Sequence, residues 1–203
     1  MNKNTRRVMA VALGLIGWTA ACEAAAVVGQ PAPEFSLVDT KGRPQSLAAL
    51  RGRYVVLEWF NKDCPFVRKH YGSGNMQRLQ TVYGARGVVW LTVVSSAPGH
   101  QGFITAEEGD AVLAERSAQP AALLLDPDGQ LGQLYGAKTT PHLFIIDPEG
   151  VLVYAGAIDD TPSTDVADVP RATNYVAKAL DEALAGKPVS VPQTKSYGCS
   201  VKY

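Results

Sequence analysis

Cysteine 64 has the sequence surroundings of a reactive thiol. It lies in the segment "NKDCPFVRKHY", where Val67 occupies the position that would complete a C-x-x-C dithiol. The segment is polar, follows an apolar run and leads into a predicted helix, so we favour a reactive thiol over an inert buried one. At a helix N-terminus, unpaired backbone N–H groups and the helix dipole favour the nucleophilic thiolate. We therefore predict that Cys64 is a nucleophile.

Neighbouring residues are expected to tune this sulfur and to border its substrate. Pro65 suits the first position of the helix, because its missing N–H is not needed there. Arg68 and Lys69 follow within about a turn and add positive potential, while Asp63 opposes them. We expect Pro65 and Arg68 to contribute to substrate binding beside Cys64.

Glu58 is a carboxylate in an unusual place. It interrupts the apolar run "YVVLEWF", six positions before Cys64. A charged carboxylate among large hydrophobic neighbours costs several kcal/mol unless it is paired or protonated. Desolvation is expected to raise its pKa. The alternative is an edge position from which the side chain reaches water.

A second sulfur is available near the C-terminus. Of the three cysteines, Cys22 lies in the N-terminal segment described next, which leaves Cys64 and Cys199. Cys199 belongs to "YGCSVKY", whose glycine and flanking aromatic residues suit a tail that docks on the domain. Two thiols in an exported protein can form a disulfide. A chain of this length can build a core without one, which favours a chemical role.

The N-terminus has the pattern of an export signal. Lys3, Arg6 and Arg7 precede an apolar run over 8–21 and the small-residue stretch "ACEAAA", which predicts a signal peptide over 1–26. The run is too short to cross roughly 30 Å of hydrocarbon. The alternative is a lipid anchor on Cys22, for which Thr19 is a poor upstream residue. We expect a periplasmic or secreted protein.

The composition limits the classes of protein to which the chain can belong. The chain has 203 residues, of which 46% are hydrophobic, and its 19 Lys and Arg balance its 19 Asp and Glu. This predicts a globular domain and gives no sign of a nucleic-acid surface.

The predicted elements alternate between strands and helices. Buried strands are predicted at 54–60, within 87–96 and at the start of 121–129, and "PHLFIIDPEGVLVYAGAI" predicts a hairpin. Helices are predicted from Cys64-Pro65 towards Tyr83 with a break at "YGSG", from Thr105 with a capping box, and at 172–188. The tail after residue 190 has no clear element. This order predicts an α/β fold with a mixed β-sheet flanked by helices.

The motifs "VVLEWFNKDCP" and "KTTPHLF" in this order resemble the thioredoxin-like fold with an N-terminal extension. From about Gln30 to Gly186 the chain is similar to redoxins of the alkyl hydroperoxide reductase/thiol-specific antioxidant and TlpA-like group. We therefore divide it into a redoxin domain over 27–190 and a tail over 191–203.

The resemblance implies roles for several residues. Pro141 takes the place of a cis-proline that faces Cys64, and Thr140 before it would offer backbone groups to a substrate. Glu58 would pass protons to and from the sulfurs. Pro141 and His142 would also border the substrate, and His142 would hold or relay a proton nearby, unless it is a core histidine. Cys199 would resolve oxidised Cys64, within one chain or across a homodimer; the alternative is a permanent structural disulfide.

Two departures from the family affect the reaction. Val67 removes the dithiol within the helix, and Leu57 and Asn61 replace the proline and hydroxyl residue of the peroxide-binding pattern. We expect a thiol oxidoreductase that acts without a cofactor on a peroxide or protein disulfide and is regenerated by an external thiol or thioredoxin-like reductant. The alternative is a binding module or metallochaperone on the same scaffold. A metal site of Cys64 with His142 or His70 is disfavoured, because the chain lacks the C-x-x-x-C pair of the copper-delivery branch.

Overall fold

The computed structural model describes residues 25–203. The predicted signal peptide over 1–26, including Cys22, lies almost wholly outside these residues. Among the helices of 25–203, none is both long enough and apolar enough to cross a membrane.

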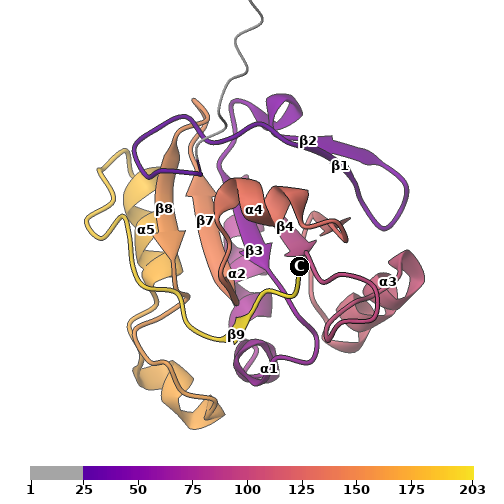
Figure 1. Ribbon diagram of the computed structural model, residues 1–203. Helices are drawn as coiled ribbons and strands as arrows, with labels where there is room; N and C mark the ends of the chain where they lie inside the picture. The colour runs from indigo at the N-terminus through magenta and orange to yellow at the C-terminus, as the bar shows by residue number, and fades with distance from the viewer. Residues whose placement is uncertain (1–24) are drawn as a thin grey trace, which may run out of the picture.

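A five-stranded mixed sheet forms the centre of the molecule, in the order β5-β4-β3-β7-β8 (Figure 1). Its middle strand β3 is buried at all five residues, as its apolar sequence predicts. Strands β3, β4 and β5 run parallel, while β7 is antiparallel to β3 and β8 is antiparallel to β7. The strands are β3 (Val55–Trp59), β4 (Val89–Val94), β5 (Ala122–Leu125), β7 (His142–Ile146) and β8 (Leu152–Gly156).

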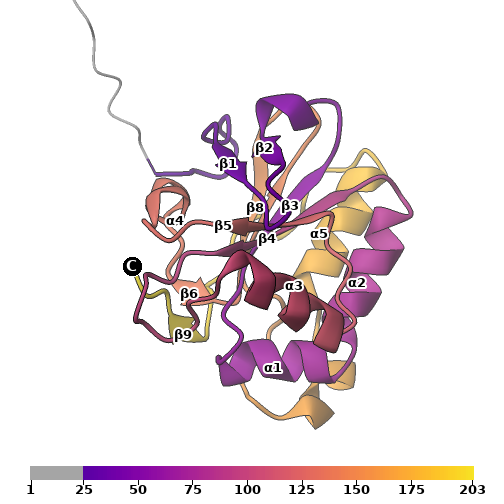
Figure 2. The same cartoon turned by 90° about the vertical axis from the view of Figure 1, so that its right-hand side faces the viewer.

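Different elements cover the two faces of this sheet. Helices α2 (Asn75–Gly84) and α5 (Tyr175–Leu184) pack on one face, together with α3 (Ala106–Glu115) (Figure 2). The other face is covered by α4 (Gln130–Tyr135) and by the N-terminal segment with strands β1 (Ser36–Val38) and β2 (Pro44–Ser46) and the short helix η1 (Ala48–Leu50). The prediction of an α/β fold with a mixed, helix-flanked sheet is confirmed.

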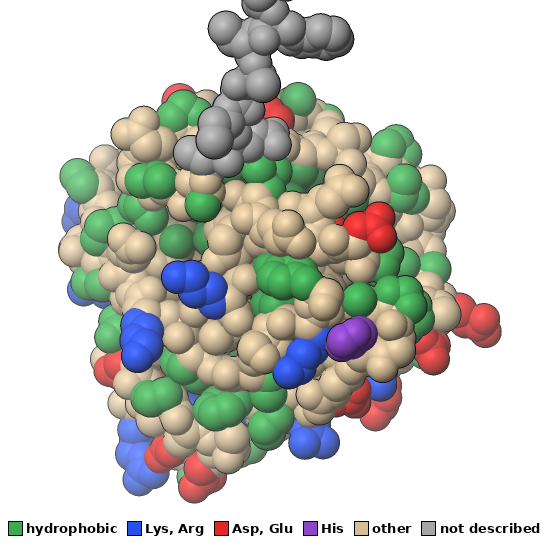
Figure 3. Space-filling view, in the orientation of Figure 1, with side chains coloured by type: hydrophobic (Ala, Val, Ile, Leu, Met, Phe, Trp, Pro, Cys, Tyr) green, Lys and Arg blue, Asp and Glu red, His purple; other side chains and the backbone are tan. Residues whose placement is uncertain are grey.

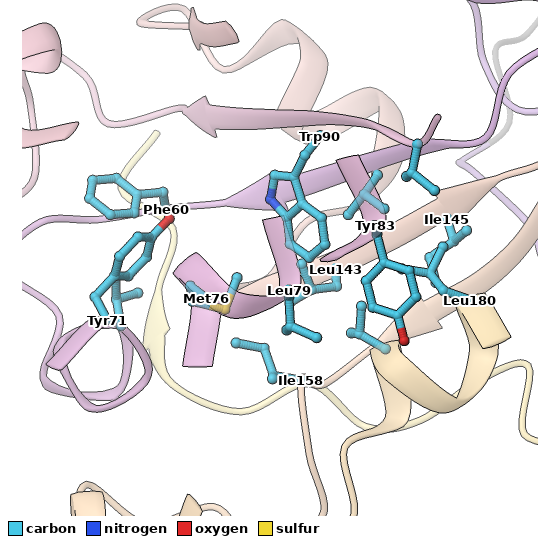
Figure 4. Packing of buried hydrophobic residues seen from close by; sticks show 14 of the residues in the cluster. Phe60, Tyr71, Met76, Leu79, Tyr83, Trp90, Leu143, Ile145, Ile158 and Leu180 are labelled. Carbon is cyan, nitrogen blue, oxygen red and sulfur yellow. The ribbon is translucent and has the colours of Figure 1, made fainter. Parts of the chain in front are cut away.

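The core beneath α2 and α5 extends to the helix that carries the reactive-cysteine motif. Figure 4 shows Phe60 and Tyr71 at one end of this cluster, Trp90 in the middle, and Tyr83 and Leu180 at the other end. These five side chains are nearly inaccessible to solvent. The large buried aromatic area fixes β3 and α1 (Pro65–Gly72) relative to one another, and Cys64 lies in the loop that joins them.

Several local predictions are confirmed. The helix that begins at Pro65 is interrupted after Gly72 and resumes as α2, where Gly74 adopts a left-handed conformation with φ of 73°. Thr105 and Glu108 form the predicted reciprocal cap of α3. The hairpin of β7 and β8 is also present.

Other elements are absent from the sequence prediction. They include strand β2, helix α4, the short helix η2 (Val166–Arg171), and the two-residue strands β6 (Thr139–Thr140) and β9 (Cys199–Ser200). The tail does not lack structure, because β9 pairs antiparallel with β6. In Figure 1 the tail (yellow) crosses the front of the domain, passes above α1 at β9 and ends beside α4. Two-residue strands carry no periodicity, so only the tertiary pairing reveals them.

Candidate active site

Cys64 sits at the N-terminus of α1, as its sequence predicts. It is the residue that caps the helix, and Pro65 occupies the first helical position. Its side chain has no solvent exposure. The thiol donates a hydrogen bond to the carbonyl oxygen of Thr140 at 2.9 Å. The Thr140–Pro141 peptide bond is cis, so the predicted cis-proline does lie beside the cysteine.

Cys199 reaches the same point from the other end of the chain. In the β6–β9 pair, Cys199 is the direct partner of Thr140, and Ser200 is the partner of Thr139. The Thr140 hydroxyl also donates to the carbonyl oxygen of Cys199 at 3.4 Å. Both cysteines are free thiols in this structure, and Cys199 lies opposite Thr140, whose carbonyl oxygen accepts from Cys64. The tail therefore delivers a second sulfur to Cys64.

Burial and hydrogen bonding together lower the pKa of one thiol and raise the pKa of the other. Burial raises the pKa of Cys64, but hydrogen bonds from the Cys199 thiol and from the backbone N–H groups of Val67 and Cys199 bring it below its ordinary value. For Cys199, burial and the hydrogen bond to Cys64 both raise the pKa. The first proton is therefore lost from Cys64, and the protonated Cys199 donates to the resulting thiolate.

The nearby basic residues divide into one that faces the site and one that does not. Arg68 is exposed, and together with Lys202 its charge opposes the rise in the Cys199 pKa. Lys69 is fully buried and points instead to the carbonyl of Thr161, at 2.8 Å, and to the carboxylate of Asp159, at 3.8 Å. The expectation that Lys69 supplies positive potential to Cys64 is wrong, because a buried cation needs a buried partner.

Glu58 is a buried carboxylate with hydrogen bonds to both oxygens. Trp90 Nε1 donates to Oε2 at 2.7 Å and the Tyr71 hydroxyl donates to Oε1 at 2.8 Å. Gln80 and Thr92 make longer contacts, at 3.5 and 3.4 Å. Burial nevertheless raises the Glu58 pKa to about 7, and the hydrogen bonds limit the rise. The predicted pKa shift is present, and the alternative of an edge position is excluded, since the residue is 1% exposed.

Glu58 does not lie directly beside Cys64, because Phe60 and the length of α1 separate the two side chains. Phe60 directly follows β3, on the same face as Glu58 and nearer to Cys64 in the chain, and its ring packs edge-on against Tyr71 at 5.5 Å. Tyr71, which holds Glu58, lies two helical turns after Cys64, about 10 Å along the axis. Direct proton exchange between Glu58 and Cys64 therefore needs a water or a movement of Phe60. The proton-transfer role of Glu58 stays a prediction.

His142 projects on the opposite face of the sheet from Cys64. Its ring packs 4.4 Å from that of Phe144, within the core under α4. The backbone N–H of Lys138 donates to Nδ1 at 3.3 Å. Burial lowers the His142 pKa to about 4, so the ring is neutral at physiological pH. The structure brings Thr140, Pro141 and Cys199 to Cys64, but it does not bring the His142 ring there, and substrate binding by His142 stays a prediction.

A buried polar network fixes the tail two residues before Cys199. The Tyr197 hydroxyl donates a short hydrogen bond to Asp159 and lies 3.1 Å from His70 Nε2. The other ring nitrogen of His70 is 3.1 Å from the amide of Asn75. Burial lowers the His70 pKa to about 4, which leaves a neutral ring that donates to Tyr197. The Tyr197 ring also packs edge-on against Phe66 of α1, at 5.7 Å.

Sequence reasoning did not find this network. Asp159, Lys69 and His70 lie in segments whose polarity gives no hint of burial, and the sequence marks Tyr197 only as an aromatic neighbour of Cys199. Within residues 25–203, this network included, no group of three or more His, Cys, Asp or Glu side chains is arranged to hold a metal ion.

Comparisons with known proteins agree with this geometry. The model of the AhpC/TSA family matches residues 28–155, a range that contains Cys64 and ends before the tail. The thiol:disulfide interchange protein DsbE of Allochromatium vinosum is 30% identical over 139 residues, which cover 66% of this chain and 69% of that protein.

Two solved structures support the fold. An uncharacterized conserved protein from Geobacillus kaustophilus has a TM-score of 0.74 at 26% identity, covering 87% of this chain and 92% of the other. The thioredoxin domain of a thiol-disulfide oxidoreductase from Bacteroides vulgatus has a TM-score of 0.51 at 22% identity, covering 64% and 89% of the two chains. The predicted thioredoxin-like fold is confirmed.

Proposed function

The chain belongs to the AhpC/TSA family, and on that premise we propose that it is a thiol oxidoreductase in which Cys64 and Cys199 form a catalytic pair. A thiol-dependent redox role has the support of the relative named as a thiol:disulfide interchange protein. The Cys199 partnership rests on this chain's own geometry, because the tail lies beyond the residues that the family model matches.

One observation carries the proposal: β9 pairs Cys199 with Thr140, whose carbonyl oxygen also accepts from Cys64 at a helix N-terminus, so the two thiols lie at one point and have opposite pKa shifts. A low pKa makes Cys64 the better nucleophile at neutral pH and also the better leaving group. Cys199 remains protonated until Cys64 is oxidised. This order of events is the one that a nucleophilic and a resolving cysteine require.

The proposed first step oxidises Cys64. Its thiolate attacks an oxygen of a hydroperoxide, the O–O bond breaks, and Cys64 becomes a sulfenic acid as water or an alcohol leaves. With a disulfide, the thiolate attacks one sulfur, forms a mixed disulfide and expels one thiolate. Either oxidant accepts two electrons over the whole cycle.

The proposed second step closes the protein disulfide. Cys199 attacks the Cys64 sulfur and passes its proton to the departing group, which is water from the sulfenic acid or the second thiol from the mixed disulfide. An external thiol, of low mass or on a thioredoxin-like protein, then reduces the bridge. Because β9 places Cys199 beside Cys64 within one chain, resolution needs no homodimer.

We further propose that the protein works outside the cytoplasm. Lys3, Arg6 and Arg7 followed by a short apolar run support export. An oxidising compartment would allow the Cys64–Cys199 bridge to persist until a dedicated reductant meets it.

The test is turnover with hydrogen peroxide and with a small disulfide, using dithiothreitol as the external reductant. The proposal expects continuous consumption of at least one oxidant by the wild type, and loss of that activity in Cys64→Ser. If neither oxidant is consumed, and the oxidised protein keeps a Cys64–Cys199 bridge that resists dithiothreitol, the bridge is a structural staple and the proposal is wrong.

A further inference from the structure

The backbone edge beside Cys64 is already occupied. Thr139 and Thr140 form β6, and an extended peptide adds to such an edge by main-chain hydrogen bonds. Here the added strand is β9 of the same chain, with Thr140 opposite Cys199 and Thr139 opposite Ser200. The N–H of Val201 continues the pairing to the carbonyl of Lys138 at 3.1 Å. The tail thus takes the place that a peptide substrate would need.

Gly198 adapts the tail closely to this edge. A Cβ atom at Gly198 would lie 2.1 Å from the carbonyl oxygen of Thr140, the same oxygen that accepts the Cys64 thiol hydrogen bond. Its φ of 130° is also one that residues with side chains rarely adopt. The close approach leaves no room for a second backbone between the tail and Thr140.

Contacts on both sides of β9 hold the tail in place. Before it, Tyr197 is bonded to Asp159 and His70. After it, the carbonyl of Lys202 accepts from the N–H of Ala97 at 2.8 Å, and the Tyr203 hydroxyl donates to the carbonyl of Ala137 at 2.7 Å. A polypeptide that displaced β9 would have to release these contacts as well.

Access to the sulfur depends on the size of the oxidant. Cys64 is wholly covered, whereas Cys199 is partly exposed at the surface. Rotation of the Cys199 side chain with a local shift of the tail would admit a molecule of a few atoms, but it would not free the strand edge. Figure 3 shows that uncharged and hydrophobic atoms with a few Lys and Arg cover much of the face that the tail crosses, and that most Asp and Glu lie towards its edges.

We infer that β9 acts as an internal substitute for a peptide substrate, so that the reduced protein accepts small disulfides or hydroperoxides and excludes polypeptide disulfides from Cys64. The inference rests on the function proposed above. It makes the tail a specificity determinant as well as the carrier of Cys199.

The test compares two oxidants on the fully reduced, full-length protein. Loss of enzyme thiols is followed under pseudo-first-order conditions with hydroxyethyl disulfide and with insulin, whose disulfides are on a polypeptide. The wild type is expected to react at least about tenfold faster with the small disulfide. Gly198→Ala, which sets a methyl group against Thr140, is expected to raise the insulin rate about tenfold or more while both cysteines remain. Gly186→Ala is the matched control, since Gly186 also has positive φ but its Cβ would meet nothing within 4 Å.

The outcomes separate this inference from the proposed function. Should Gly198→Ala fail to fold, Val201→Pro removes a ladder N–H instead and is expected to raise the insulin rate in the same direction. A wild type that oxidises as fast with insulin as with the small disulfide, or a folded variant with an unchanged insulin rate, would overturn the inference and leave the catalytic pair intact. A wild type whose thiols survive both disulfides and hydrogen peroxide would instead overturn the proposed function.

Discussion

A buried ionisable group lies at each end of α1, and the two groups differ in whether burial or hydrogen bonding decides the direction of the pKa shift. At the N-terminal end, Cys64 is buried but has a lowered pKa. At the C-terminal end, Tyr71 binds Glu58, which is equally buried but has a pKa raised to about 7. Burial opposes ionisation at both ends, so burial alone does not decide which group carries a charge.

The two groups differ in whether the hydrogen bonds to the charged form outweigh the free-energy cost of burying that charge. The Cys64 sulfur is stabilised by backbone N–H groups at the helix start and by the Cys199 thiol, which outweigh its desolvation. Glu58 receives hydrogen bonds from side chains of the core, which reduce the desolvation effect without overcoming it. One end is therefore prepared to react, and the other to hold or release a proton near neutral pH.

The largest expected effect is on the turnover rate, which should depend more strongly on Cys64 than on Glu58. Cys64→Ser is expected to lower the rate by at least about a thousandfold, since it removes the nucleophile. Glu58→Gln keeps the shape of the side chain and is expected to slow turnover by about a hundredfold, the lower end of the range for a lost proton-transfer group. Steady-state rates with dithiothreitol as reductant measure both. Equal losses in the two variants would break the comparison, and no loss in Glu58→Gln would make Glu58 purely structural.

The next effect tests whether the tail network positions the sulfur pair. Tyr197→Phe removes the hydroxyl that binds Asp159 and His70 but keeps the ring on Phe66. Loss of a hydrogen bond to a charged group, about 1.5–3 kcal/mol, is expected to slow closure of the Cys64–Cys199 bridge about tenfold or more. Stopped-flow oxidation with hydroxyethyl disulfide reports this step. Tyr175→Phe is the control, because the structure records no hydrogen bond from that hydroxyl, and an equal slowing there would remove the positioning role.

A smaller effect concerns the stability of the Glu58 end. Folding raises the Glu58 pKa from 4.5 to about 7, so the folded protein binds the extra proton across this window. Stability is therefore expected to fall as pH rises from about 4.5 to about 7, by about 3 kcal/mol from this residue. Urea unfolding at pH 5 and pH 8 measures the change. Glu58→Gln should reduce the difference between the two pH values; an unchanged difference would show that another group titrates.

The smallest effect isolates the hydrogen bond between the thiols. Cys199→Ser retains a donor to the Cys64 sulfur, whereas Cys199→Ala removes it. A hydrogen bond donated to the thiolate, worth about 1.5 kcal/mol at the low end for a charged acceptor, predicts a Cys64 pKa about 1 higher in the alanine variant than in the serine variant. Iodoacetamide labelling across pH gives both midpoints. Identical midpoints would assign the lowered pKa to the helix N-terminus alone.

The comparison of the two ends also shows which features can be predicted from the sequence. Cys64 and Pro65 predict a helix start, and Glu58 predicts a buried carboxylate, because both signals are local in the chain. Their placement and the direction of their pKa shifts agree with prediction. The sequence does not reveal which distant residues stabilise these two groups. Trp90 and Tyr71 hydrogen-bond to Glu58, and the tail contacts Cys64.

The tail shows the limit most clearly. Cys199 and its aromatic neighbours suggest docking, but β9 has two residues and no periodic pattern. Its position depends on Tyr197, Asp159 and His70, which are brought together only by the fold. Lys69 shows the same limit from the other side, since it is close to Cys64 in sequence and yet points to Asp159.

Mass spectrometry of the oxidised protein decides whether Cys199 resolves Cys64 within one chain. Reduced wild type is treated with one equivalent of hydrogen peroxide or hydroxyethyl disulfide, alkylated, separated without reduction and digested. Resolution within one chain predicts a monomer in which neither Cys64 nor Cys199 is alkylated and a cross-linked peptide joins them. In Cys199→Ser it predicts an adduct or a sulfenic acid on Cys64. An oxidised wild type with alkylated Cys199 and a stable Cys64 sulfenic acid, or a bridge that joins two chains, would contradict it.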